Sequence, residues 1–159
     1  MADVAEILKS SGNLYDQSAN QRGLSLIELM ITVVVFGILV GVAVPAYTEQ
    51  VAKTRRADAK GAVLGLAQAA ERFNTVNGTF TGAVIGNVAN SIYPNEAPLD
   101  GNNKFYDLTL TITGGGASYT ITAAPKGVQT GDKCGTFSLT SAGVKTLSGN
   151  TATAEYCGW

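Results

Sequence analysis

The chain of 159 residues contains no histidine, and this absence removes the side chain that most often serves as a general base or metal ligand. It has only two cysteines, too few for a structural zinc site without histidine. No phosphate-binding glycine loop, nucleophile elbow or dinucleotide fingerprint occurs. The glycine-rich stretch 113–118 lies between two strand-like segments and opens no helix, so we expect a hairpin turn there. We therefore expect no enzyme activity, no metal and no cofactor.

The sequence is also poor in charge. Only 14% of its residues are charged, against about 25% in a typical soluble domain, and the net charge at pH 7 is −1. This balance provides no bulk attraction to nucleic acid. In place of charge the chain has one long apolar segment, followed by a half that is rich in threonine, glycine and asparagine.

The apolar segment carries no charged residue from Leu29 to Tyr47. A helix of that length spans about 28 Å, close to the hydrocarbon core of a bilayer at about 30 Å. A cleaved secretory signal is the alternative, but it would have a basic start and a shorter apolar core, of about 7–15 residues. We therefore predict a membrane-spanning helix over residues 24–47.

The helix is expected to continue beyond the membrane span. Apolar residues recur there at intervals of three and four, the spacing of one helical face: Ala59, Ala62, Val63, Leu66, Ala69, Ala70 and Phe73. The pair Asn77-Gly78 then favours a helix end. The pattern predicts one helix from Leu24 to about Val76, whose second half needs a packing partner on one face only.

Two glycines and a proline interrupt the span. Gly37 and Gly41 form a small-xxx-small pattern, which is typical both of close helix contacts and of ordinary membrane helices, and both interpretations stay open. Pro45 removes a backbone donor and is expected to loosen the preceding turn.

Glu28 is the only acid in the apolar region, and a carboxylate there costs roughly 2.5–3.5 kcal/mol on insertion scales. Near the end of the span it could reach the lipid headgroups. If the chain were cut after Gly23, the new α-amine of Leu24 would instead be a cation one helical turn away. That amine could pair with Glu28 of a neighbouring copy and set the register between them.

The C-terminal half shows alternation of period two between turn residues. It predicts strands over 105–112, 118–124, 135–140 and 144–147, with a long connection over 77–104. The expected fold class is therefore α+β. A long N-terminal helix, transmembrane in its first half, packs its second half on a four-stranded antiparallel sheet.

At its N-terminal residues the sequence resembles the type IV pilins, the substrates of prepilin peptidase. That family has a glycine at the cleavage point and a glutamate five residues later, and this chain matches at Gly23, Glu28, Gly37, Pro45 and Tyr47. Leu24 stands where the family usually has phenylalanine.

The resemblance implies a pilin fold and a defined processing route. Residues 1–23 would be a leader that prepilin peptidase removes, and the new amine of Leu24 would be methylated. Residues 24–47 would be the transmembrane and filament-core helix, with Gly37, Gly41 and Pro45 among its assembly residues, and 48–159 the head.

Four basic residues follow the span, and by the positive-inside rule they favour a cytoplasmic C-terminus: Lys53, Arg55, Arg56 and Lys60. The family topology and the cysteines place the head outside instead. We expect a single-pass protein of the bacterial inner membrane with a periplasmic head, and then an extracellular pilus.

In a cytosolic protein Cys134 and Cys157 could equally be unpaired core thiols, but in an exported head they are expected to pair. A tail closed by two cysteines also resembles the D-region of pilins. The segment "GDKCGTFSLTSAGVK" and the ending "YCGW" are similar in particular to PilE-type pilins, which are often minor pilus components.

The function that the resemblance implies is that of a structural subunit of a type IV pilus, for twitching motility, adhesion or DNA uptake. Its partners would be copies of itself and other pilins, prepilin peptidase and the inner-membrane assembly platform, with nucleic acid only in a DNA-uptake pilus. One alternative is a pseudopilin of a type II secretion system, although pseudopilins more often stabilise this tail with calcium. A single-span membrane enzyme or sensor is another alternative.

Overall fold

The computed structural model describes residues 23–159, so the expected leader, apart from Gly23, lies outside the described residues. The chain divides into two compact units, Met1–Ala43 and Val44–Trp159. Helix α1 (Leu26–Asn77) begins in the first unit and ends in the second. The helix starts two residues later than expected and ends one residue later, which confirms the long helix.

The described part of the first unit is the apolar stem of α1. Its side chains are exposed, including Phe36 at 69%, and the helix is long and apolar enough to cross a membrane. The Thr32 hydroxyl donates to the carbonyl oxygens of Glu28 (2.8 Å) and Leu29 (2.9 Å). This polar group is therefore satisfied within the helix, as a hydrocarbon environment requires.

The second half of α1 buries the stripe that the spacing predicted. Six of its seven members are at most 3% exposed, and Phe73 is half-buried: Ala59, Ala62, Val63, Leu66, Ala69 and Ala70. The helix ends where Gly78 adopts a φ of +70° and the Asn77 side chain donates to the Phe73 carbonyl oxygen at 2.8 Å.

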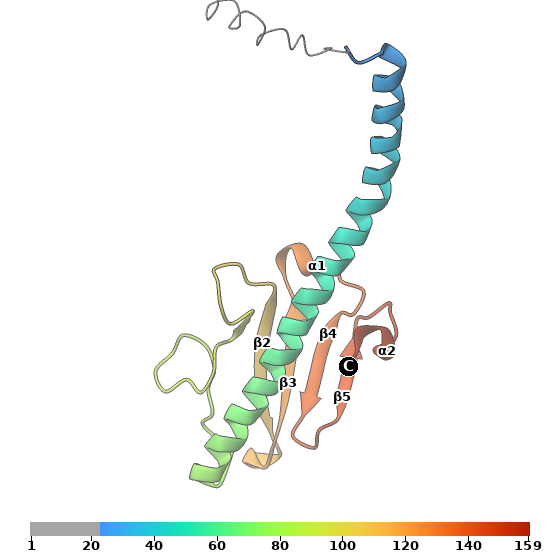
Figure 1. Cartoon of the computed structure of the whole chain (residues 1–159). Coiled ribbons are helices and arrows are strands. Elements are labelled where there is room, and N and C mark those ends of the chain that lie inside the picture. Colours follow the sequence, from blue (N-terminus) through green and yellow to red (C-terminus); the bar gives the residue numbers. More distant parts are fainter. Residues whose placement is uncertain (1–22) are drawn as a thin grey trace, which may run out of the picture. The chain divides into compact units, whose positions relative to one another are not determined.

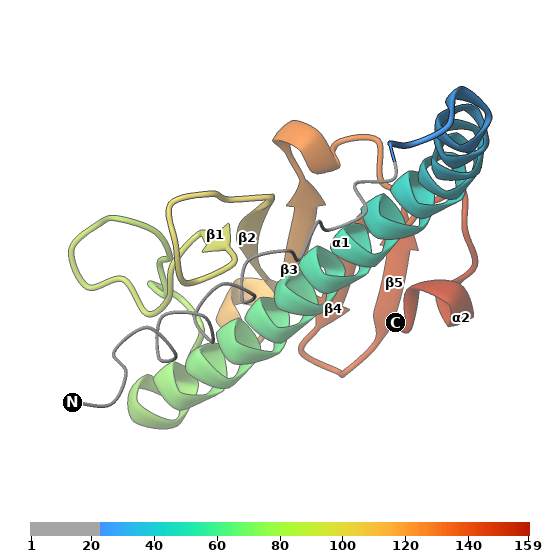
Figure 2. The same ribbon diagram turned by 45° about the horizontal axis from the view of Figure 1, so that its top comes forward.

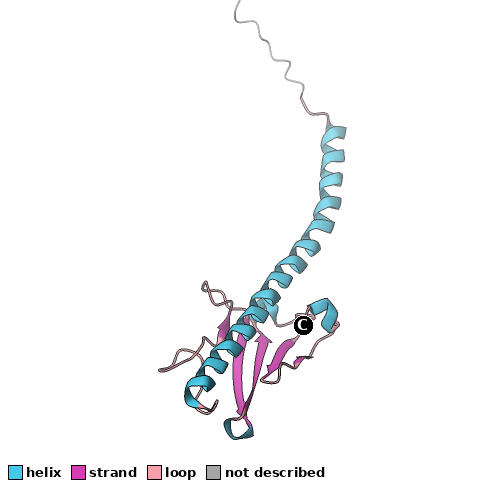
Figure 3. Cartoon of the chain, turned by 60° about the horizontal axis from the view of Figure 1, so that its bottom comes forward, coloured by secondary structure: helices cyan, strands magenta, loops and turns pink. Residues whose placement is uncertain are grey.

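A five-stranded antiparallel sheet lies against this half of α1, as Figures 1 and 2 show, and Figure 3 distinguishes its strands from the helices. The strands are adjacent in chain order: β1 (Glu96–Ala97), β2 (Tyr106–Thr113), β3 (Ser118–Pro125), β4 (Thr136–Thr140) and β5 (Lys145–Ser148). A short helix, α2 (Ala154–Cys157), follows.

Four of these strands agree with the expected ranges to within two residues, and β1 is an addition. It lies inside the long connection, where Glu96 pairs with Asp107 and Ala97 with Tyr106. A strand of two residues is too short to show alternation, so the expected number of strands was one too few.

The two faces of the sheet differ sharply. The face toward α1 carries large buried side chains, with Ile121 and Phe137 at 0% and Leu108 at 4% exposed. The opposite face, which we call the hydroxyl face, presents paired threonines and serines: Thr109, Thr111, Thr113, Ser118, Thr120, Thr122, Thr136, Ser138, Thr140, Thr146 and Ser148.

The β2–β3 hairpin turns through Gly114–Gly116, which confirms the turn expected for 113–118. Gly116 is buried with a φ of +94°, and its carbonyl oxygen accepts from the Phe80 backbone N–H at 2.9 Å. A Cβ at this position would collide with the hydroxyls of Thr79 and Thr81. The glycine thus lets the hairpin pack against the chain that leaves α1.

Candidate functional site

The expected assembly residues lie on an open helix surface. Leu24 is 75% exposed, and Glu28 lies in the first turn of α1, where the helix dipole favours a negative charge. Within residues 23–159 the Glu28 carboxylate forms no ion pair, so nothing in the described chain compensates its charge.

Gly37 and Gly41 have no contact that would require a glycine within the chain itself. A Cβ added at either position would meet no atom within 4 Å in the described part of the chain. At Gly65, by contrast, an added Cβ would collide with the Tyr93 hydroxyl. The stem glycines therefore leave a surface that another helix could approach closely.

Pro45 lies inside α1, which continues on both sides of it. Its carbonyl oxygen accepts a hydrogen bond from the Thr48 hydroxyl at 2.9 Å.

A buried ion pair ties α1 to the loop before β4. The Arg56 guanidinium contacts the Asp132 carboxylate through Nη2 at 2.5 Å and through Nε at 2.9 Å, and the two side chains are 4% and 2% exposed. Arg56 Nη1 also donates to Glu49 at 3.0 Å, and the Tyr156 hydroxyl donates to the same carboxylate oxygen at 2.5 Å. One arginine thus connects the helix, the loop and α2.

The ion pair shifts the proton equilibria of its members. The hydrogen bonds to Asp132 and Glu49 raise the pKa of Arg56 above its usual value against the opposing effect of burial. The hydrogen bond from Tyr156 and the nearby Arg56 and Lys133 lower the pKa of Glu49 to about 2 from 4.5.

Glu49 makes the stability of the head depend on pH. Because its pKa is depressed by folding, its stabilising contribution is complete above about pH 4.5 and is lost as the pH falls toward 2. We expect Glu49→Gln to reduce the acid-induced fall in melting temperature by roughly 2–5 °C between pH 5 and pH 2.5. Calorimetry on the full chain in detergent micelles measures the melting temperature at each pH. The matched control is Glu155→Gln, at an exposed position of α2; an equal acid-induced fall in the wild type and in Glu49→Gln would contradict the assignment.

Cys134 and Cys157 form a disulfide, with 2.03 Å between the sulfurs and 5.8 Å between the Cα atoms. The bond lies beside the ion pair, since Asp132 Oδ2 accepts from the Cys134 backbone N–H at 3.1 Å. On its other side the Lys60 amine donates to the Cys157 carbonyl oxygen at 2.9 Å. The disulfide therefore joins the tail to the loop before β4, the ion pair joins that loop to α1, and the Lys60 hydrogen bond joins the tail to α1 directly.

Sequence reasoning did not find this ion pair. Arg56 and Asp132 are 76 residues apart, and neither belongs to a recognisable motif. The sequence feature that could have indicated it was the run of four basic residues after the span. We interpreted this run only as evidence on which side of the membrane the C-terminus lies. The structure shows that Arg56 and Lys60 are used within the head.

A second group of side chains, which we call the basic corner, consists of two cations, Lys60 and Lys145, and the ring of Trp159. The Lys145 amine lies 4.8 Å from the centre of the Trp159 ring, and that ring packs on Phe137 at 5.4 Å. Burial lowers the pKa of Lys60, and the charges of Lys145 and Arg56 lower it further. Neither Lys60 nor Lys145 forms an ion pair with a carboxylate of residues 23–159, so positive potential accumulates here.

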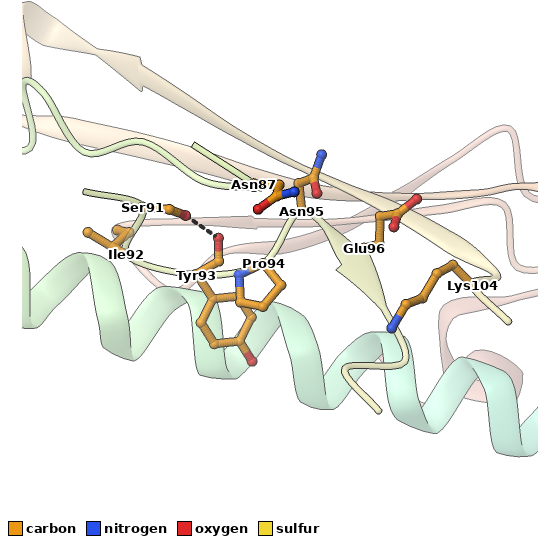
Figure 4. A pocket seen from close by; sticks show the side chains of 9 residues that line it. Asn87, Ser91, Ile92, Tyr93, Pro94, Asn95, Glu96 and Lys104 are labelled. Atoms are coloured by element: carbon orange, nitrogen blue, oxygen red, sulfur yellow. Dashed lines mark hydrogen bonds between the residues drawn. The ribbon is translucent and has the colours of Figure 1, made fainter. Parts of the chain in front are cut away.

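The long connection before β2 forms a hollow of about 440 Å³ (Figure 4). Its charged side chains are already engaged, because Lys126 pairs with Glu96 and the Lys104 amine donates to the Pro98 carbonyl oxygen at 2.7 Å. The side chains of Asn87 and Asn95 lie close together at its edge. The hollow thus presents two amides, a lysine held by backbone carbonyl oxygens and a glutamate held by Lys126.

Comparison with known proteins identifies the family. The family model described as "Type IV minor pilin ComP, DNA uptake sequence receptor" matches residues 45–138, and the one described as "Prokaryotic N-terminal methylation motif" matches residues 18–44. The fimbrial protein EcpC of Eikenella corrodens is 31% identical over 100 residues, which are 59% of this chain and 65% of that protein. The chain thus spans just under two thirds of the length of this curated relative.

Two solved structures are similar to the chain. A type IV pilin from Shewanella oneidensis is 26% identical, with a TM-score of 0.46 over 64% of this chain and 98% of that one. The non-core minor pilin PilV of Neisseria meningitidis is 22% identical, with a TM-score of 0.47 over 65% of this chain and 93% of that one.

The methylation motif coincides with the apolar stem, and the pilin match covers the head up to β4. Pilin families are structural, and their apolar N-terminal helix serves as a membrane anchor before the subunit enters an extracellular filament. These findings favour a pilus subunit over a pseudopilin of a secretion system. Because the pilin model matches more than half of the chain, this protein belongs to the type IV minor pilin family.

Proposed function

We propose that this pilin is a minor subunit of a DNA-uptake pilus and acts by assembly and binding, not by catalysis. The observation that carries the proposal is the match of residues 45–138, which is the head up to β4, to a family described as a DNA uptake sequence receptor.

Processing follows the pilin route in this proposal. Prepilin peptidase cleaves after Gly23, the amine of Leu24 is methylated, and the subunit waits in the inner membrane for the assembly platform. The match of residues 18–44 to the methylation motif supports the cleavage site. The disulfide between Cys134 and Cys157 supports a periplasmic head, because such bonds persist in oxidising compartments.

The basic corner is the best candidate for the contact with DNA. Phosphate binding depends on cations that are not already neutralised. Arg56 and Lys126 are paired with carboxylates inside the head, whereas Lys60 and Lys145 are not. Trp159 adds an aromatic side chain beside them, although its indole N–H is already donated to the Ser138 carbonyl oxygen at 3.0 Å.

Replacing Lys145 by glutamine is expected to weaken DNA binding about three- to tenfold and to lower the slope of log affinity against log salt by about 1. Binding of a labelled duplex to the full chain in detergent, measured over a series of salt concentrations, tests this. The matched control is Lys126→Gln, whose amine is held by Asp107 at 2.6 Å and by Glu96. An unchanged salt slope in Lys145→Gln would exclude the basic corner, and no loss of transformation in a strain lacking the gene would refute the DNA-uptake function.

A further inference from the structure

A groove of about 380 Å³ lies in the second unit, between α1 and the turn that joins β3 to β4. Its helix side runs over Thr48–Arg56 and its other side over Val128–Lys133. The orange turn beside α1 in Figure 1 forms this second side. Thr48, which directly follows the apolar run ending at Tyr47, is part of the lining.

Arg55 is the cation of this groove that has no carboxylate partner among residues 23–159. Its Nη1 donates to Gln129 Oε1 at 3.3 Å, and its guanidinium carbon lies 4.0 Å from the centre of the Phe105 ring. Gln129 is only 3% exposed, so a buried amide and an aromatic face hold the guanidinium in place. Most of its five N–H donors stay uncommitted.

The remaining charges of the groove are used within it. The Asp132 and Glu49 carboxylates bind Arg56, and the Lys133 amine lies 3.5 Å from Glu49. These four charges cancel, and Arg55 leaves the groove with one net positive charge. A ligand with a single negative charge and several acceptor oxygens fits that balance.

The position of Arg55 along α1 indicates where the ligand comes from. Arg55 follows Tyr47 by eight residues, or about 12 Å of helix, and side chains lean about one turn, roughly 5 Å, toward the helix N-terminus. The guanidinium is therefore about 7 Å from the end of the hydrocarbon segment. The headgroup layer on each side of a bilayer is about 5–7 Å thick, so the guanidinium lies at its outer edge.

Two exposed side chains beside the groove suit the same environment. Tyr47 is 72% exposed at the end of the apolar run, the place where tyrosines anchor membrane helices at the headgroups. Val128 is 77% exposed at the lip of the groove, an apolar side chain that water does not favour but a lipid surface does.

We propose that this groove binds the phosphate of an anionic phospholipid headgroup through Arg55 while the subunit is stored in the membrane. The proposal rests on the membrane storage described under the proposed function. It gives three of the four basic residues after the span a use outside the cytoplasm: Arg56 and Lys60 stabilise the head, and Arg55 binds lipid.

Native mass spectrometry of the full chain in mild detergent, titrated with phosphatidylglycerol, tests the proposal. We expect the wild type to retain phosphatidylglycerol in preference to phosphatidylcholine, and Arg55→Gln to lower the apparent affinity about fivefold. Arg72→Gln is the matched control, since it removes the same charge from the same helix about 38 Å beyond Tyr47. Arg55→Lys keeps the charge but loses the planar guanidinium, so its apparent affinity should lie between those of the wild type and Arg55→Gln.

Several results would overturn the proposal. Equal lipid retention in the wild type and Arg55→Gln would show that the groove does not bind the headgroup. Displacement by millimolar inorganic phosphate would make it a free-phosphate site, and displacement by a DNA duplex in an Arg55-dependent manner would make DNA the ligand. Thermal unfolding of each variant reports whether Arg55→Gln has lost its fold, in which case Arg55→Lys decides alone. Recovery of the chain in the soluble fraction of cells would refute membrane storage itself, independently of the detergent titration.

Discussion

Asp132→Asn is expected to destabilise the head by about 3–5 kcal/mol, because it leaves the buried Arg56 guanidinium without its main counter-charge. The side chains of the two residues are 4% and 2% exposed, so water cannot replace the lost partner. The same substitution weakens the acceptor for the Cys134 backbone N–H, next to the disulfide.

A double-mutant cycle with Arg56→Met separates the pair from its surroundings. We expect the double variant Arg56→Met/Asp132→Asn to be little worse than either single variant, since one loss already breaks the interaction. Denaturant unfolding followed by the fluorescence of Trp159, the only tryptophan, gives the free energies. Lys126→Met serves as the control, because surface ion pairs contribute about 0–1 kcal/mol. Single variants within 1 kcal/mol of the wild type would show that the pair does not hold the loop before β4 on α1.

Glu28→Ala is expected to be cleaved and inserted normally and yet to enter filaments at least tenfold less often. When the stem leaves lipid and packs among other stems, an uncompensated Glu28 carboxylate would be buried at a cost of several kcal/mol. In our proposal the Leu24 amine of a neighbouring subunit supplies the compensating charge and so fixes one axial register. Alanine removes the interaction that selects this register.

Immunoblots of sheared filaments against the membrane fraction measure this incorporation. Incorporation of Glu28→Asp should be intermediate, since its charge remains but its side chain is shorter. Thr32→Ala is the control, because it removes a polar group one helical turn later. Mass spectrometry should find the mature chain starting at a methylated Leu24 in every variant. Wild-type incorporation of Glu28→Ala would refute the pairing, and uncleaved Glu28→Ala would instead make the acid a recognition element for the peptidase.

Local periodicity predicted most of the fold. The strands over 105–148 were found because each has one buried face and one exposed face, a pattern that a single strand displays by itself. The stripe from Ala59 to Ala70 was found for the same reason. Strand β1 was missed, since two residues cannot show a period.

The candidate sites also differ in whether the local sequence reveals them. Glu28 was visible because an acid within an apolar run is a local anomaly. The Arg56–Asp132 pair and the Arg55 groove were not visible, since they join α1 to a loop more than 70 residues further along the chain. Charges that meet only after folding leave no regular spacing in the sequence.

The hydroxyl face has a consequence for how filaments meet one another. Its threonines and serines neither titrate in the physiological range nor attract counterions. At its β1 edge Lys126 pairs with both Glu96 and Asp107, which leaves one net negative charge there. Lateral bundling of pili through the threonine and serine part of this face would therefore respond little to ionic strength or acidity, in contrast to bundling through charged surfaces.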